Sequence, residues 1–188
     1  MASNATENLD EVRVKVQIEI SAAAYQEKNI LPNLMQDYLY EFSQISDVEL
    51  DDTGQFHYRY LDYYWTEPDR YPFLIRVQGD LVGFVLLRKG TYFPLQLDND
   101  QAGRLIAEFF VMKGYHRQGV GTRAALDLFA RFPGRWEIAQ EPGNHGGQDF
   151  WRNLVSDCCG GEFKEYVLDN ESWCGPVQVF DNSVSAVN

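Results

Sequence analysis

Cysteine and histidine are both scarce in this chain, with three residues of each among 188. Two of the cysteines, Cys158 and Cys159, are adjacent, so the sequence lacks the spaced pairs of a disulfide framework. A reducing compartment such as the cytoplasm is therefore the simpler expectation. The histidines show neither helical nor Cys-His spacing, which argues against a zinc site, and we expect no bound metal.

Long apolar runs are also missing. No uninterrupted apolar stretch approaches the length needed to cross a bilayer. The first eight residues lack the basic and apolar regions of a signal peptide. Positive charge is in short supply too, because 16 Lys and Arg stand against 28 Asp and Glu, for a net charge of −12. This balance predicts no nucleic-acid partner and favours the approach of a cationic substrate such as an amine, while the lack of long apolar runs predicts no membrane partner.

The length and the apolar content of 45% predict one globular domain with a single sizeable core. We place this domain at 11–181, between polar ends at 1–10 and 182–188 that we expect to be flexible. The order of elements is typical of the α/β class, with a mixed sheet that carries helices on its faces. Hydrophobic periodicity predicts strands at 12–20, 73–78, 81–88, 105–112, 135–140, 162–168 and 177–180, and helices at 31–42, 121–132 and 144–155.

The most informative stretch is 105–132. It begins with an apolar, aromatic run of strand length and ends in an amphipathic helical pattern. Between them lies a loop with Gly119 and Gly121 at the point where the helix begins. Such a loop aims unpaired backbone N–H groups at one spot, next to the positive end of the helix dipole. The pattern predicts a phosphate or pyrophosphate cradle, although glycines that only shape a turn would give the same six residues.

Two familiar cradles fit this loop poorly. The phosphate loop of nucleotide hydrolases ends in Gly-Lys-Ser/Thr, whereas Thr122 follows Gly121 directly. The dinucleotide fingerprint has a third glycine where Ala124 stands, and its ribose-binding acid is not clearly placed.

The loop instead resembles the acyl-CoA-binding motif of the GCN5-related N-acetyltransferase (GNAT) superfamily, Arg/Gln-x-x-Gly-x-Gly/Ala. Here the motif reads His-Arg-Gln-Gly-Val-Gly over 116–121, with His116 in the first place and Arg117 beside it as a source of positive charge. The resemblance implies an acyl-CoA N-acyltransferase fold, a mixed and mostly antiparallel sheet of about seven strands with helices on both faces. It also implies that acetyl-CoA is the acyl-donor substrate, and that a homodimer is a common state. The donor-binding residues it implies in this stretch are Phe110, Val111, Met112, Arg117, Gln118, Gly119, Val120, Gly121 and Thr122.

A second resemblance lies in the helix predicted from Asn144. Asn144 followed by Phe150 and Trp151 is similar to the superfamily's Asn-x-x-Ala-x-x-Phe-Tyr/Trp helix. The resemblance implies that Asn144 hydrogen-bonds near the pantetheine or the substrate, and that Trp151 lies near the thiol. Many members carry Tyr there as the acid for the leaving thiolate, and Trp has no acidic proton to give.

Glu108 is the candidate general base. An acid inside an apolar central strand costs free energy unless it is paired or used. An attacking amine must lose a proton, and a carboxylate within reach, directly or through water, can take it. The alternative is a structural carboxylate tied to an arginine. The aromatic and charged segment at 56–65 is a further open case, either a loop packed on the core or the lining of an amine pocket.

Three functions remain on the sequence alone. The first is an acetyl-CoA-dependent N-acetyltransferase that acts on a primary amine, of a small molecule or a protein, by direct attack. The second is a CoA-binding sensor or interaction module without catalysis, which Trp151 in place of Tyr keeps open. The third is a nucleotide-binding protein that uses the same loop.

Overall fold

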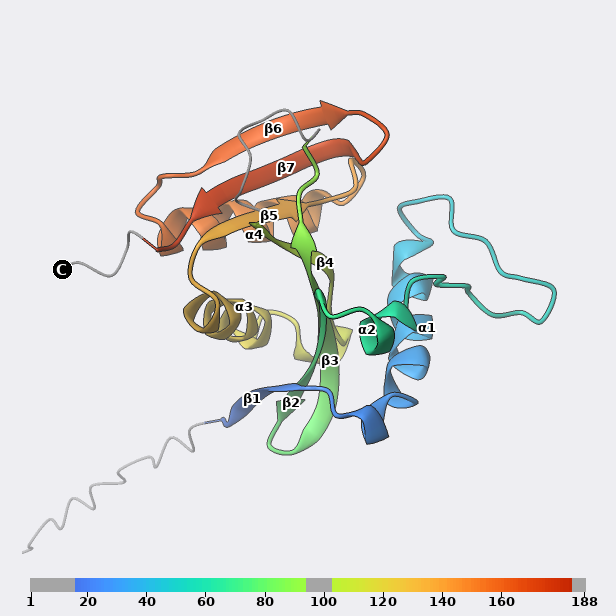
Figure 1. Cartoon of the computed structure of the whole chain (residues 1–188). Helices are drawn as coiled ribbons and strands as arrows, with labels where there is room; N and C mark the ends of the chain where they lie inside the picture. Colours follow the sequence, from blue (N-terminus) through green and yellow to red (C-terminus); the bar gives the residue numbers. More distant parts are fainter. Residues whose placement is uncertain (1–15, 94–102, 184–188) are drawn as a thin grey trace, which may run out of the picture.

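The computed structural model describes residues 16–93 and 103–183 (Figure 1). Residues 1–10, residues 12–15 of the first predicted strand and most of the predicted flexible end at 182–188 lie outside these ranges. Seven strands of the described chain form one sheet in the order β1-β2-β3-β4-β5-β7-β6. They are β1 (Ile18–Ala22), β2 (Arg70–Val77), β3 (Asp80–Gly90), β4 (Gly103–Val111), β5 (Arg135–Ala139), β6 (Lys164–Asp169) and β7 (Cys174–Asp181).

The sheet is mixed and mostly antiparallel, which confirms the predicted fold class. Five of its neighbouring pairs are antiparallel, and β4 with β5 is the parallel pair. Parallel neighbours need a crossover connection, and the helix α3 (Val120–Arg131) provides it. The predicted order of strands and longer helices is therefore present in the described residues.

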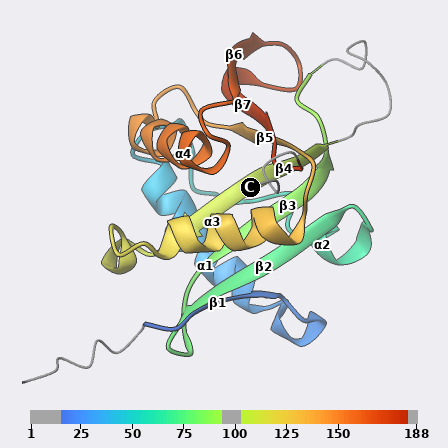
Figure 2. The ribbon, with the colours of Figure 1, turned by 90° about the vertical axis from the view of Figure 1, so that its left-hand side faces the viewer.

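Helices cover both faces of the sheet (Figure 1). Helix α1 (Ile30–Phe42) and the short α2 (Tyr63–Thr66) pack on one face, where Leu34 meets Phe84 and Phe110 in a buried cluster. We call this side the α1 face. Helices α3 and α4 (His145–Cys158) pack on the other side, the α3 face, together with Ile106 and Leu128. Figure 2 shows α3 running across the strands of this face. Among the described helices, none is both long and apolar enough to cross a membrane.

A β-bulge in β4 decides which face receives Glu108. In the pairing of β3 with β4, Leu87 lies opposite Ile106 and Leu86 lies opposite Glu108, so Ala107 is an extra residue. Strand side chains alternate between faces, and one inserted residue reverses the alternation beyond it. Ile106 packs on the α3 face, and a regular strand would turn Glu108 the same way. The bulge instead turns Glu108 toward the α1 face.

Candidate active site

The parallel strands β4 and β5 separate soon after they meet. They pair only from Arg104 to Ile106 of β4, opposite Trp136 to Ile138 of β5, although β4 continues to Val111. On the β5 side, the second half of β4 therefore has no strand neighbour among the described elements. Its backbone N–H and C=O groups on that edge can pair with an extended ligand, as an added strand would. The predicted donor-binding residues Phe110 and Val111 lie in this free half.

The loop after β4 is fastened by its own side chains. A ring nitrogen of His116 hydrogen-bonds the carbonyl oxygen of Val111 at 2.6 Å, and the Gln118 amide donates to the carbonyl of Gly114 at 2.7 Å. The short 3₁₀ turn η2 (Lys113–Tyr115) lies between these contacts. His116, in the first place of the motif, thus holds the loop against the end of β4. Met112 is the N-cap residue just before this turn.

The start of α3 leaves backbone N–H groups without helical partners. Gly119 precedes the helix in the left-handed conformation, with φ of 78°, and no side chain caps the helix. The first N–H with a described backbone acceptor is that of Arg123, which donates to Gly119 at 2.9 Å. The N–H groups of Val120, Gly121 and Thr122 are therefore available to a ligand. With the helix dipole behind them, they suit an anion.

Arg117 adds positive charge beside this helix start. Its side chain is exposed, and it forms no ion pair within the described part of the chain. Its backbone also has a positive φ of 58°, which helps the loop to turn into the helix. The residues of the predicted cradle, 117–122, are thus grouped at one end of α3.

Asn144 and Trp151 occupy the predicted helix but face different surroundings. The Asn144 side-chain oxygen accepts from the backbone N–H of Gly147 at 2.9 Å, which confirms the predicted N-cap of α4. A Cβ at position 147 would lie 2.6 Å from the Asn144 amide nitrogen, so a larger residue there would displace the capping side chain. Trp151 is only 5% exposed and packs edge-on against Phe109, with ring centroids 5.0 Å apart.

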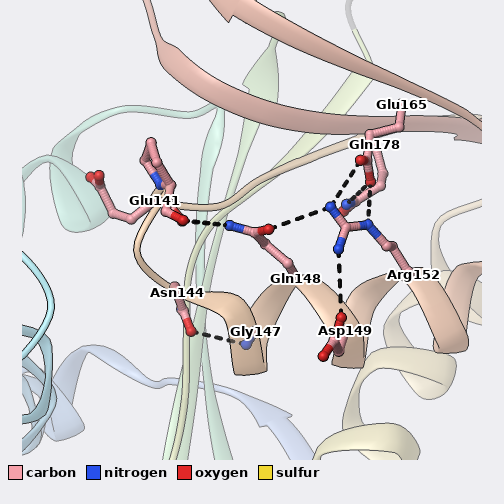
Figure 3. Close-up of polar contacts among 9 residues, drawn as sticks. Glu141, Asn144, Gly147, Gln148, Asp149, Arg152, Glu165 and Gln178 are labelled. Atoms are coloured by element: carbon pink, nitrogen blue, oxygen red, sulfur yellow. Dashed lines mark hydrogen bonds and ion pairs between the residues drawn. The ribbon is translucent and has the colours of Figure 1, made fainter.

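A glutamine that the sequence analysis did not single out holds the loop before α4. The side-chain amide of Gln148 donates to the carbonyls of Glu141 and Pro142, each at 3.0 Å. Its oxygen accepts from Arg152, which also pairs with Glu165 (Figure 3). The Glu141 side chain turns away from Gln148 in this view. The loop is thus fixed where β5 ends beside the free half of β4.

Glu108 lies on the opposite side of β4, among tyrosines. The hydroxyl of Tyr38 in α1 donates to Glu108 Oε2, and the hydroxyl of Tyr58, between α1 and α2, donates to Oε1 at 2.8 Å. No arginine or lysine of the described residues pairs with Glu108, so the alternative of an arginine-tied carboxylate is wrong for this part of the chain. The segment at 56–65 packs on the α1 face and places the Tyr58 hydroxyl against Glu108.

The surroundings shift the ionisation of Glu108. The pKa of Glu108 is raised to about 7, because burial and the charge of Glu141 raise it by more than the hydrogen bonds from Tyr38 and Tyr58 lower it. Burial also raises the pKa of the Glu141 carboxyl. A carboxyl with a pKa near neutrality can exchange a proton with an amine at physiological pH.

Sequence reasoning missed Tyr38, Tyr58 and Glu141 as neighbours of Glu108. Tyr38 lies on the apolar stripe of α1, so its position predicts a core residue. Tyr58 is one of many aromatic residues in its segment. For Glu141, the parallel pairing of β4 and β5 was the available signal, because their carboxyl ends meet at one edge of the sheet. No cluster of metal-ligating side chains occurs in residues 16–93 and 103–183.

Comparisons with known proteins agree with this arrangement. The model of the acetyltransferase (GNAT) family matches residues 32–154. The chain therefore belongs to the GNAT acetyltransferase family, as the loop motif predicted. No curated protein matches the sequence.

Solved structures share the fold at low sequence identity. An acetyltransferase from Thermus thermophilus is 15% identical, with a TM-score of 0.60 over 87% of this chain and 96% of that one. A GNAT-family acetyltransferase from Staphylococcus aureus is 16% identical, with a TM-score of 0.60 over 88% and 99%. The PaiA N-acetyltransferase of Thermoplasma acidophilum, solved in complex with coenzyme A, is 11% identical, with a TM-score of 0.56 over 88% and 99%.

Proposed function

We propose that this protein is an acetyl-CoA-dependent N-acetyltransferase that moves an acetyl group to a primary amine by direct attack. The observation that carries the proposal is the separation of β4 from β5 next to the uncapped start of α3. A free strand edge suits the amide-bearing pantetheine arm, and a helix N-terminus suits the diphosphate. Membership of the GNAT family supports the same donor.

The residues of the chain fit acetyl-CoA on two counts. Gly119 is left-handed, and apart from its chain neighbours no described atom lies within 4 Å of where its Cβ would be, so the backbone there is open to a close approach. Arg117 is an exposed cation beside the same N–H groups. Acetyl-CoA, when bound, supplies the activated acetyl group as a thioester. Backbone N–H groups of β4 beyond Glu108 would hydrogen-bond the thioester carbonyl and stabilise the charge that develops on it.

Glu108 would act as the general base. A primary ammonium has a pKa of about 10.4, so a bound acceptor arrives mostly protonated and must lose a proton before it attacks. Glu108, on the α1 face and with a pKa of about 7, can take that proton directly or through a water molecule. The negative charges of Glu108 and Glu141 would also attract a cationic acceptor to this side of β4.

A direct experiment separates this proposal from its competitors. Titration calorimetry with acetyl-CoA and with ATP tests the donor site, and binding of ATP without binding of acetyl-CoA would overturn the proposal. Release of free CoA thiol in the presence of an amine panel, with mass spectrometry of the products, tests the transfer. The panel would contain polyamines, aminoglycosides, amino acids and peptides with free N-termini.

The second candidate, a CoA-binding module without catalysis, rests on Trp151. The ring stands where many relatives have Tyr, and it is buried against Phe109. Tight binding of acetyl-CoA with no product from any amine would favour this candidate.

A further inference from the structure

Both oxygens of the Glu108 carboxylate are held by hydroxyl groups. Tyr38 donates to Oε2, and Tyr58 donates to Oε1 at 2.8 Å. A carboxylate held at one oxygen can still turn about its last bond, whereas one held at both keeps its plane. Each oxygen retains a further lone-pair site, so a proton can still be accepted there.

Helix α1 places both donors: it contains Tyr38, and its Gln36 holds the connection that carries Tyr58. Tyr38 belongs to the helix and is 9% exposed. Tyr58 lies in the connection to α2, and Gln36 of α1 fastens that connection: its amide donates to the carbonyl of Phe56, and its oxygen accepts from the Phe56 N–H, both at 2.9 Å. This two-way pairing fixes the backbone two residues before Tyr58.

We propose that Tyr38 and Tyr58 are positioning residues that orient the Glu108 carboxylate for proton acceptance, and that Gln36 keeps Tyr58 in place. The proposal rests on the function proposed above, in which Glu108 is the base. In the step concerned, the N–H bond of the ammonium breaks, its electron pair stays on nitrogen, and the proton bonds to a Glu108 oxygen. The tyrosines keep their own protons throughout.

The charges around Glu108 agree with this division of roles. Burial and the charge of Glu108 raise the pKa of both Tyr38 and Tyr58, so each hydroxyl remains a donor at physiological pH. Their hydrogen bonds favour the ionised carboxylate, which is the form that a base needs. The titratable groups that interact electrostatically with Glu108 are Tyr38 of α1, Tyr58 of the α1–α2 connection, Tyr64 of α2, Tyr92 after β3 and Glu141 after β5.

The first test needs no substrate. Carbon-13 NMR of the protein labelled at glutamate carboxyls, with the Glu108 signal assigned through Glu108→Gln, follows the ionisation of this one group. We expect Tyr38→Phe and Tyr58→Phe each to raise its pKa by roughly one unit, since each removes a hydrogen bond to the charged form. Tyr40→Phe is the matched control on α1, because Tyr40 is 64% exposed and its hydroxyl has no hydrogen-bond partner among the described residues. An unchanged or lower pKa in both test variants would overturn the proposal.

The second test is the pH profile of kcat. In each test variant the rising limb of kcat should shift to higher pH by the same amount as the pKa of Glu108. The plateau at high pH should also fall about threefold or more, because the orientation of the carboxylate is lost. Gln36→Ala should reproduce the Tyr58→Phe profile, and it leaves both tyrosines intact. If Tyr38→Phe does not fold, Tyr58→Phe and Gln36→Ala decide the question. Profiles that match the wild type in these variants would contradict the proposal, whereas failure of the wild type to acetylate any amine would instead count against the proposed function.

Discussion

The two sides of β4 are built from contacts of very different range. On the α3 face the candidate donor site depends on neighbours in sequence: His116 reaches back 5 residues to Val111, and Asn144 reaches forward 3 residues to Gly147. On the α1 face Glu108 is held by Tyr38 and Tyr58, which precede it by 70 and 50 residues. The loop and helix start of the proposed donor side are thus held by local contacts, whereas the residues around Glu108 on the proposed acceptor side meet only through long-range contacts.

This difference predicts that the two sides respond differently to mutation. Changes on the donor side should weaken acetyl-CoA binding and leave the pH dependence of turnover in place. Changes around Glu108 should alter turnover and its pH dependence and leave acetyl-CoA binding in place.

The largest effect is expected for Glu108→Gln. The amide keeps the shape, and its oxygen can still accept from one of the two tyrosines, but it cannot take a proton, so kcat should fall by about 10²–10³-fold at neutral pH. The dissociation constant of acetyl-CoA, measured by calorimetry, should stay within about twofold. Full turnover across the pH range would remove Glu108 from the mechanism.

The same variant should change how stability depends on pH. The pKa of Glu108 is about 7 in the folded state, against an ordinary value of 4.5, so the folded protein binds more protons between these values. Stability contributed by protonated Glu108 is therefore full below about pH 4.5 and is lost as the pH rises to about 7.

Glu108→Gln removes that loss. We compare the free energies of unfolding of the two proteins by urea denaturation at about pH 5 and at about pH 8. The value of the variant minus that of wild type should increase by roughly 2 kcal/mol from the lower to the higher pH. Parallel pH curves for the two proteins would show that Glu108 has an ordinary pKa in the folded state.

On the donor side, Gly119→Val should weaken acetyl-CoA binding by about tenfold. A β-branched residue is strained at the φ of 78° that precedes α3, so the N–H groups of the helix start would move. Gly114→Ala is the control, since that glycine has no positive φ and no described atom lies within 4 Å of its Cβ position. Equal affinities for the two variants would contradict a role for the Gly119 conformation.

The smallest effect is expected for Arg117→Gln. Loss of one exposed cation should weaken acetyl-CoA binding by about threefold at low ionic strength, and the difference should shrink as salt is added. Lys113→Gln removes another exposed charge from the same loop and serves as the comparison. If both variants lose the same affinity, Arg117 has no specific place in the site.

The fold was predictable because its elements have clear periods. The strand, loop and helix over 105–132 are recognisable from residues close in sequence, and the Asn144 cap follows from a side chain that favours helix starts. Family membership followed from the same local motif.

The surroundings of Glu108 were not predictable in the same way. Tyr38 has the spacing of a core residue in an amphipathic helix, and its hydroxyl partner depends on how α1 is placed on the sheet. Tyr58 belongs to a segment with many aromatic residues and no period, where the Gln36 contacts and a bridge from Leu50 fix the backbone at Phe56. A pairing of tyrosine with a distant acid has no signature in a single sequence.

The extra residue at Ala107 decides which face of the sheet receives Glu108, the proposed base. If the same residues of β4 were paired without the bulge, Glu108 would enter the aliphatic layer beneath α3, and Phe109 would face the two tyrosines. The presence of the bulge in β4, rather than the composition of the strand, decides which layer receives the charge. An alignment of relatives that ignores the bulge would match the wrong residue to Glu108.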